Sequence, residues 1–179
     1  MAQYITRQGA TAYFANKLFT SLWGSTSPQN QDISLTQASG IIDCLKFVGE
    51  KNASWLVRVQ LIGGSDPRNV ILTDAQELQI VQAGLTQALE FPRGADTVVP
   101  VDIQNACCEI AFALLNGVDP DMDMQQSWIK SQGFSVVRTS YENSYIPEYI
   151  QAGIPSPTAW KFLKKYVYDN YDITLKRVT

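Results

Sequence analysis

The chain has 179 residues, and 45% of them are hydrophobic, which is enough for one domain with a buried core. Only 17% of the residues are charged, and the net charge of −3 does not favour an electrostatic nucleic-acid binder of the usual basic kind. The sequence contains no histidine, the commonest general base of enzymes, and this favours a protein that is not an enzyme.

The first part of the chain predicts two amphipathic helices. The first spans about Thr6–Leu18, where apolar residues recur at helical spacing. The second spans about Pro28–Lys46, because Ser27 followed by Pro28 is a favoured helix start and an apolar stripe follows this pair. We expect both helices to bury their apolar faces in one core.

The next segment predicts a strand and a helix. Residues 54–62 are rich in branched and aromatic side chains and precede Gly63 and Gly64, so they predict a strand that pairs with Asn69–Leu72 as a hairpin. Asp74 and Glu77 have the spacing of a capping box, and apolar residues in helical register follow them up to Pro92.

The clearest predicted helix begins at Asp102 and ends at Gly117, with six apolar residues on one face: Ile103, Ala106, Cys107, Ile110, Ala111 and Leu114.

The last part of the chain predicts a strand, a linker and a helix. Apolar and polar residues partly alternate over Phe134–Tyr141, which predicts a half-exposed strand. Residues 144–158 contain several prolines and predict an extended linker. Ser156 before Pro157 then starts a last helix, which we expect to reach about Tyr168.

These elements predict a mainly α fold: a small helical bundle with a β-hairpin or short strands, and an extended C-terminal arm that ends in a helix. We expect the bundle domain to span residues 1–143 and the arm to span residues 144–179. No segment approaches the roughly 20 apolar residues that span a bilayer, and no signal-peptide pattern follows Met1. We therefore expect a protein made in the cytoplasm, with no membrane partner.

No motif predicts catalysis, a cofactor or a metal. Asp119, Asp121 and Asp123 alternate as in a calcium loop, but Met124 and Lys130 occupy the positions where an EF-hand has its glycine and its glutamate. The pair Gly63-Gly64 lacks the spacing of a phosphate-binding loop. Adjacent Cys107 and Cys108 lie on an apolar helix, where we expect small core residues. We expect no catalytic, cofactor-binding or metal-binding residues.

The C-terminal segment differs from the rest of the chain in charge. Residues 156–179 contain five basic residues and two acidic residues, whereas residues 1–155 are net acidic. The run Trp160–Tyr166 mixes lysines with aromatic rings, a composition that binds nucleic-acid backbones and stacks on bases. The interpretation we favour is an amphipathic helix that docks on a partner through an apolar face.

Two segments together resemble a phage protein family. The first is Thr11–Ala15 (TAYFA) followed by a helix that ends with Ile41–Gly49 (IIDCLKFVG). The second is Leu89–Gly94 (LEFPRG), then Val99–Ile103 (VPVDI) and Ala106–Gly117 (ACCEIAFALLNG). In order and spacing they resemble the head-to-tail connector, or adaptor, family of tailed bacteriophages, some members of which are labelled single-stranded-DNA-binding proteins. Residues 50–88 look like an insertion relative to the compact family core.

The resemblance implies a structural ring, commonly of twelve subunits, in the neck of the virion. The ring would bind the portal protein, join the next tail or neck protein and extend a channel through which double-stranded DNA passes without sequence-specific binding. The C-terminal arm would dock on the portal through six residues: Trp160, Lys161, Leu163, Lys164, Lys165 and Val167. The alternative, from the family's other label, is a single-stranded-DNA-binding replication accessory protein.

Overall fold

A computed structural model describes residues 2–63, 70–119, 121–122, 125, 131–134, 137–140 and 146–168. The chain is mainly helical, as the sequence predicts. The elements are α1 (Arg7–Ala15), α2 (Ser21–Ser25), α3 (Pro28–Asp43), α4 (Asn52–Ile62), α5 (Asp74–Thr86), α6 (Val101–Leu115), β1 (Ser131–Phe134), β2 (Val137–Ser140), α8 (Glu148–Gln151) and α9 (Pro157–Leu163). No described helix has the length and apolar character needed to cross a membrane.

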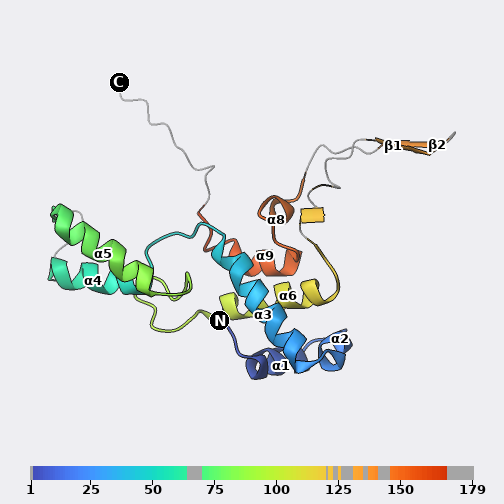
Figure 1. The fold of residues 1–179 in the computed structure, drawn as a ribbon, viewed down its shortest axis with the longest axis horizontal. Helices are drawn as coiled ribbons and strands as arrows, with labels where there is room; N and C mark the ends of the chain where they lie inside the picture. The colour runs from blue at the N-terminus through green and yellow to red at the C-terminus, as the bar shows by residue number, and fades with distance from the viewer. Residues whose placement is uncertain are drawn as a thin grey trace.

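The core lies where α3, α6 and α9 meet (Figure 1). Helix α6 packs against α3 on one side and α9 on another, and the short helices α1 and α2 close the remaining side. Ile42 of α3, Ile110 of α6 and Leu163 of α9 are all fully buried. Cys107 and Cys108 are also fully buried, which confirms them as core residues, and burial raises the pKa of the Cys107 thiol to about 11.

Three predicted helix starts are confirmed, and side chains cap all three. The hydroxyl of Thr6 accepts a hydrogen bond from the backbone N–H of Gly9 at the start of α1. Ser27 and Ser156 do the same for α3 and α9, each followed by a proline at the first helical position. Such caps satisfy backbone N–H groups that have no partner inside the helix.

The predicted strand over residues 54–62 is wrong, because this segment forms helix α4. Its buried side packs against α5, where the Ser54 hydroxyl donates to the carbonyl of Ile80 at 3.0 Å. Gly63 is not in a hairpin turn but is the C-cap of α4, with a left-handed φ of 63° that glycine adopts without strain. The hairpin partner Asn69–Leu72 forms no strand at residues 70–72, and Asn69 lies outside the described residues.

The predicted caps of α5 and α6 are shifted in the structure. The capping box of α5 consists of Thr73 and Gln76, one residue before the predicted Asp74 and Glu77. Helix α6 begins at Val101 after Pro100, so Asp102 lies inside its first turn and does not cap it. The predicted stop at Gly117 is confirmed, since its N–H donates to the carbonyl of Leu114 and its φ is 79°.

The extended linker predicted after residue 144 is wrong for residues 146–158. They contain helix α8 and the fully buried Ile154, and α9 follows with Ala159 and Leu163 fully buried against α6. Two of the prolines here start helices, because Pro147 and Pro157 stand at helix N-termini, where a missing N–H costs nothing. The predicted domain boundary at 143/144 lies outside the described residues.

Two short strands precede α8. β1 and β2 pair antiparallel, with Ser131 opposite Ser140 and Phe134 opposite Val137. Figure 1 shows them away from the helical core. The single strand predicted over Phe134–Tyr141 is therefore replaced by parts of two strands, and Tyr141 itself lies outside the described residues.

Candidate interaction surfaces

The residues expected to dock a partner do not form one exposed face. Leu163 is fully buried in the core between α9 and α6, so it is not accessible to a second protein. Val167 is half-buried and pairs with Phe47 in an isolated antiparallel bridge. Trp160 is half-buried and packs against the core. The apolar stripe of this helix therefore serves the protein's own core.

The lysines of this segment remain at the surface, and two of them hold α9 in place. Lys164 pairs with Glu148 of α8 at 2.6 Å, and the indole N–H of Trp160 donates to the same carboxylate. The hydrogen bond from Lys164 is the main cause that lowers the pKa of Glu148. Lys165 pairs with Asp102 of α6, whose carboxylate raises the pKa of the lysine. Lys161 is exposed and forms no ion pair with the described part of the chain.

A buried acid links α6 to α1. Glu109 is only 5% exposed, and its carboxylate accepts hydrogen bonds from the hydroxyl of Tyr13 and the ammonium of Lys17. Burial, followed by the contact with Glu109, raises the pKa of Tyr13 above its usual value. Tyr13 comes from the first segment that carries the family resemblance, and Glu109 comes from the second.

A second acid links the end of α3 to the segment after α5. The carboxylate of Asp43 accepts a hydrogen bond from the backbone N–H of Glu90 at 3.1 Å and another from the hydroxyl of Tyr4. Burial raises the pKa of Asp43 above its usual value. Asp43 and Glu90 again belong to the two different segments that carry the resemblance.

Arg93 fastens the loop after α5 to the loop after α3. Its guanidinium donates to the backbone carbonyls of Phe47, Val48 and Gly49 and pairs with Glu90 at 2.6 Å. It also lies over the ring of Phe47, 5.8 Å from the centroid. We call this set of contacts the Arg93 clamp. The clamp uses the planar fork of an arginine, because a lysine cannot donate in so many fixed directions.

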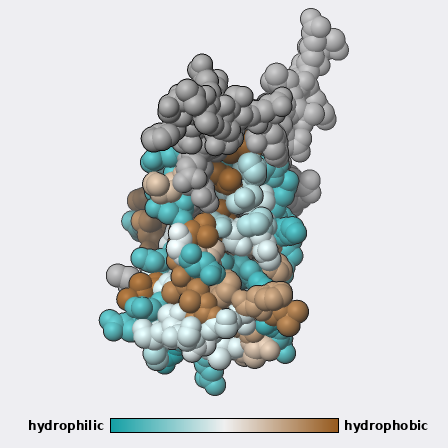
Figure 2. All heavy atoms as spheres, turned by 90° about the vertical axis from the view of Figure 1, so that its right-hand side faces the viewer, coloured by the Kyte–Doolittle hydropathy of each residue, from teal (hydrophilic) through white to brown (hydrophobic). Residues whose placement is uncertain are grey.

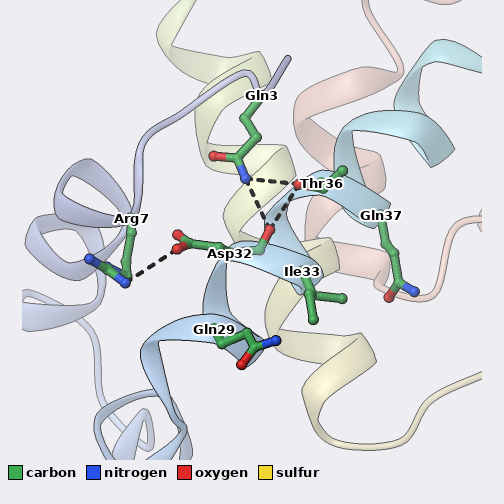
Figure 3. A pocket seen from close by; sticks show the side chains of 7 residues that line it. All are labelled: Gln3, Arg7, Gln29, Asp32, Ile33, Thr36 and Gln37. Atoms are coloured by element: carbon green, nitrogen blue, oxygen red, sulfur yellow. Dashed lines mark hydrogen bonds and ion pairs between the residues drawn. The ribbon is translucent and has the colours of Figure 1, made fainter. Parts of the chain in front are cut away.

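The polar residues near α1 and α3 line a shallow hollow (Figure 3). Arg7 pairs with Asp32 at 3.2 Å, and the amide of Gln3 donates to the Asp32 carbonyl and to the hydroxyl of Thr36. These polar groups satisfy one another. At these four positions, the hollow is therefore lined by side chains that already have partners within the protein.

The described residues contain no cluster of metal-binding side chains. They contain no group of three or more cysteine, aspartate or glutamate side chains that could hold a metal ion. Asp119, considered above as a calcium ligand, accepts the backbone N–H of Asp121 at 3.0 Å and so closes a turn. Asp123 lies outside the described residues.

The sequence analysis missed an exposed apolar surface on α4 and α5. Five large aliphatic side chains lie exposed there, from 41% to 79%: Leu56, Val59, Leu78, Val81 and Leu85. Leu78, Val81 and Leu85 belong to the apolar residues in helical register from which the sequence predicts this helix, but the register does not tell which side is buried. The residues of α5 that are buried are instead Ile80 and Gly84.

Comparisons with protein-family models, with curated proteins and with solved structures found no match. A functional assignment therefore rests on the residues and contacts described above.

Proposed function

We propose that the protein is a head-to-tail adaptor, a structural ring protein in the neck of a tailed bacteriophage virion, and not an enzyme. One observation carries the proposal: the residues behind the family resemblance contact each other across the two segments. Tyr13 meets Glu109, Asp43 meets the backbone of Glu90, and Arg93 meets Phe47. The motifs therefore belong to one packed unit, and a chance resemblance of two short segments does not require such contacts.

The exposed apolar surface on α4 and α5 supports an assembly role. A cyclic ring needs two different patches on each subunit, because each copy contacts its two neighbours through opposite sides. Large aliphatic side chains that remain in water on a chain with few charges are typical of surfaces covered by partners. In the virion we expect the protein to form a ring, commonly of twelve copies, around a DNA channel.

The portal protein is the proposed partner of the surface around α9. Leu163, which we expected to dock on the portal, is fully buried and so is not part of that surface. Lys161 is the exposed lysine of α9, and it forms no ion pair with the acids of the described chain, so it is the residue we expect to meet an acidic group of the portal. The opposite side of the ring would receive the next tail or neck protein.

The alternative, a single-stranded-DNA-binding accessory protein, rests on the basic and aromatic run Trp160–Tyr166. Stacking on bases requires accessible aromatic faces, but Trp160, Phe162 and Tyr166 all pack against the core. Lys164 and Lys165 are paired with acids of α8 and α6. The run therefore offers little free surface to a nucleic acid, and this function ranks second.

The proposal is tested in the phage that encodes the chain. Mass spectrometry of purified virions should find the protein in several copies per particle. When its gene carries a stop codon, electron microscopy should show DNA-filled heads and separate tails. Normal tailed particles that lack the protein would contradict the adaptor role.

The portal contact has its own test. Lys161→Glu should lose co-sedimentation with the purified portal, because it reverses the unpaired charge without touching the core. Lys46→Glu, at an exposed lysine just beyond α3, is the matched control and should still co-sediment. Equal binding by both variants would remove Lys161 from the portal surface.

A further inference from the structure

Helices α4 and α5 form an antiparallel hairpin that packs apart from the main core. They pack mainly against each other, at the side of the molecule away from α1 and α2 (Figure 1). Figure 2 faces the other side, where apolar side chains gather in the lower half, at the level of α1 and α2. The buried aliphatic side chains of the hairpin are Ile62 and Ile80, and neither belongs to the core cluster around α3, α6 and α9.

Contacts inside the hairpin hold its two helices together. The Ser54 hydroxyl donates to the Ile80 carbonyl at 3.0 Å, in the region where Gly84 lets the helices approach closely. The side-chain oxygen of Gln87, at the C-cap of α5, accepts the N–H of Ala53 at 3.2 Å. The start of α4 and the end of α5 are therefore joined to each other, and we expect the pair to move as one unit.

The hairpin meets the main body at its base. The segment after α5 belongs to the main body, because Phe91 is only 2% exposed and lies in the core cluster. The N–H of Asn52 donates to the Pro92 carbonyl at 3.0 Å, and the N–H of Gly94 donates to the Glu50 carbonyl at 2.8 Å. These two backbone hydrogen bonds attach the start of α4 to the segment that follows Phe91.

Glu90 joins the main body to the hairpin through three of its atoms. Its N–H donates to Asp43 of α3, and one carboxylate oxygen pairs with Arg93 at 2.6 Å. The other carboxylate oxygen pairs at 3.0 Å with Lys51, which directly precedes α4. These three charged side chains are 12% to 26% exposed, so salt and solvent screen their attraction less than at the open surface. The ion pair between Lys51 and Glu90 therefore connects the hairpin to a carboxylate that the main body holds in place.

The chain enters the hairpin through a glycine. Gly49 has a φ of 83°, and no atom lies within 4 Å of the position that a side chain would occupy. Hinges are formed by a few residues at the ends of elements that absorb changes in φ and ψ. Rotation at Gly49 moves α4 while Phe47 stays buried in the core, and residues 87–89 form the second joint, between α5 and Glu90.

We propose that the hairpin is a latched arm. It swings away from the main body as one unit while the core stays folded, with Gly49 and residues 87–89 as its joints. The ion pair between Lys51 and Glu90 is the latch that keeps the arm closed. This conformational device does not depend on the adaptor role. It lets the exposed aliphatic side chains of α4 and α5 change position without any change in the core.

The latch is tested through two amides of the base. The N–H groups of Asn52 and Gly94 donate across the junction, so their hydrogen exchange, followed by NMR, reports its opening. Glu90→Gln removes the charge and keeps the N–H that bonds to Asp43. It should raise the opening constants of both amides together by about tenfold and leave the central amides of α6 unchanged. Unchanged constants at Asn52 and Gly94 would overturn the proposal, and so would an equal rise in α6.

Two further variants identify the ion pair as the latch. Lys51→Met removes the pair from the hairpin side, so adding it to Glu90→Gln should raise opening by less than it does alone. Glu148→Gln is the matched control, because it removes the ion pair with Lys164 between α8 and α9 and should leave the junction amides unchanged. Independent effects of Lys51→Met and Glu90→Gln would overturn the latch, as would an equal rise in Glu148→Gln.

The movement itself is measured by electron paramagnetic resonance between pairs of spin labels, with the exposed Cys44 replaced by serine. Labels at Gln29→Cys and Gln79→Cys measure the distance from α3 to α5. Labels at Gln60→Cys and Gln79→Cys measure the distance between the two helices of the hairpin. All three glutamines are exposed, so the labels leave the packing intact.

Glu90→Lys should open the arm, because it replaces attraction to Lys51 by repulsion. We expect a second distance between α3 and α5 in this variant, and one unchanged distance between α4 and α5. One unchanged distance for both pairs of labels would overturn the movement. A changed distance within the hairpin would also overturn the proposal, because the two helices would then separate and not move as one unit.

Discussion

At the level of single residues, two acids join segments that lie far apart in the sequence. Glu109 holds α1 against α6 through Tyr13 and Lys17, and Asp43 holds the end of α3 against the segment that follows α5. Hydrogen bonds to a carboxylate are stronger than those between neutral groups, and a buried carboxylate that loses its partners destabilises the fold. Both acids therefore have a structural role, because each joins two distant segments of the chain.

Asp43→Asn should change how stability depends on pH. Because burial raises the pKa of Asp43, the folded protein holds this proton more tightly than the unfolded chain. That contribution is present below the unfolded pKa of about 4 and is lost as the pH rises through the folded pKa. The free energy of unfolding of the unchanged protein, minus that of Asp43→Asn, should therefore fall as the pH is raised from about 4 toward neutrality.

The measurement is a set of urea titrations of both proteins across that range. The amide oxygen of asparagine still accepts hydrogen bonds from Tyr4 and from the Glu90 backbone, so the comparison isolates the charge. A difference that stays constant, or that grows with pH, would contradict the raised pKa.

Ile110→Ala should lower the free energy of unfolding by about 2–5 kcal/mol, because Ile110 is fully buried where α6 crosses its neighbours and its removal leaves a cavity. Val98→Ala is the matched control, since Val98 is 72% exposed and should change stability by no more than about 0.5 kcal/mol. Urea unfolding followed by circular dichroism measures both, and equal midpoints would contradict the core assignment.

At the level of elements, the sequence predicts helix starts well where a capping residue and a proline stand together, as at Ser27 and Ser156. It fails at α4, because Trp55, Val57 and Val59 favour strands by propensity while the packing of α4 on α5 decides the structure. Gly63 was ambiguous as well, since a glycine ends a helix as readily as it forms a hairpin turn.

The candidate docking site could be predicted only in part, for a related reason. An amphipathic stripe has the same spacing whether it faces its own core, as Leu163 does, or remains exposed, as Val81 does. Contacts such as that between Tyr13 and Glu109, 96 residues apart, leave no signal in local spacing. Only the fold decides which stripe is buried and which remains for a partner.

Gly84→Ala should destabilise the hairpin, because its new methyl group would meet the Ser54 hydroxyl at 2.4 Å where α4 and α5 approach closely. We expect a loss of about 1–3 kcal/mol, reduced by the better helix propensity of alanine. Adding Ser54→Ala should restore part of the loss, because it removes the clashing oxygen.

Gly40→Ala in α3 is the control for the backbone effect. Nothing lies within 4 Å of its new methyl group, so the substitution should stabilise the protein by about 0.5–1 kcal/mol. Thermal unfolding of the four proteins completes the comparison. A Gly84→Ala protein as stable as Gly40→Ala would contradict the close approach of the two helices.

At the level of the whole molecule, the C-terminal helices complete the core. Truncation after Tyr145 should abolish cooperative unfolding, because it removes the buried Ile154, Ala159 and Leu163 and exposes one side of α6 to water. An arm separate from the bundle domain, as the sequence predicts for residues 144–179, would instead leave the truncated chain folded. Lys161→Ala, which changes an exposed residue of the same segment, should melt like the unchanged protein. A truncated chain with a sharp urea transition would restore the arm as a separate unit.

The negative net charge of the whole chain predicts weak binding to DNA. Non-specific binding to single-stranded DNA grows with the number of cations that displace counterions from phosphates, and this chain has a net charge of −3. Lys164 and Lys165 also pair with Glu148 and Asp102, so an approaching phosphate competes with an acid for each of them. We expect a Kd no tighter than about 10⁻⁶ M at physiological salt, measured by fluorescence anisotropy with a labelled oligonucleotide. Changing all three lysines of the run, Lys161, Lys164 and Lys165, to alanine should alter this weak binding only slightly. Nanomolar binding that disappears in the triple variant would instead favour the replication accessory function over the adaptor.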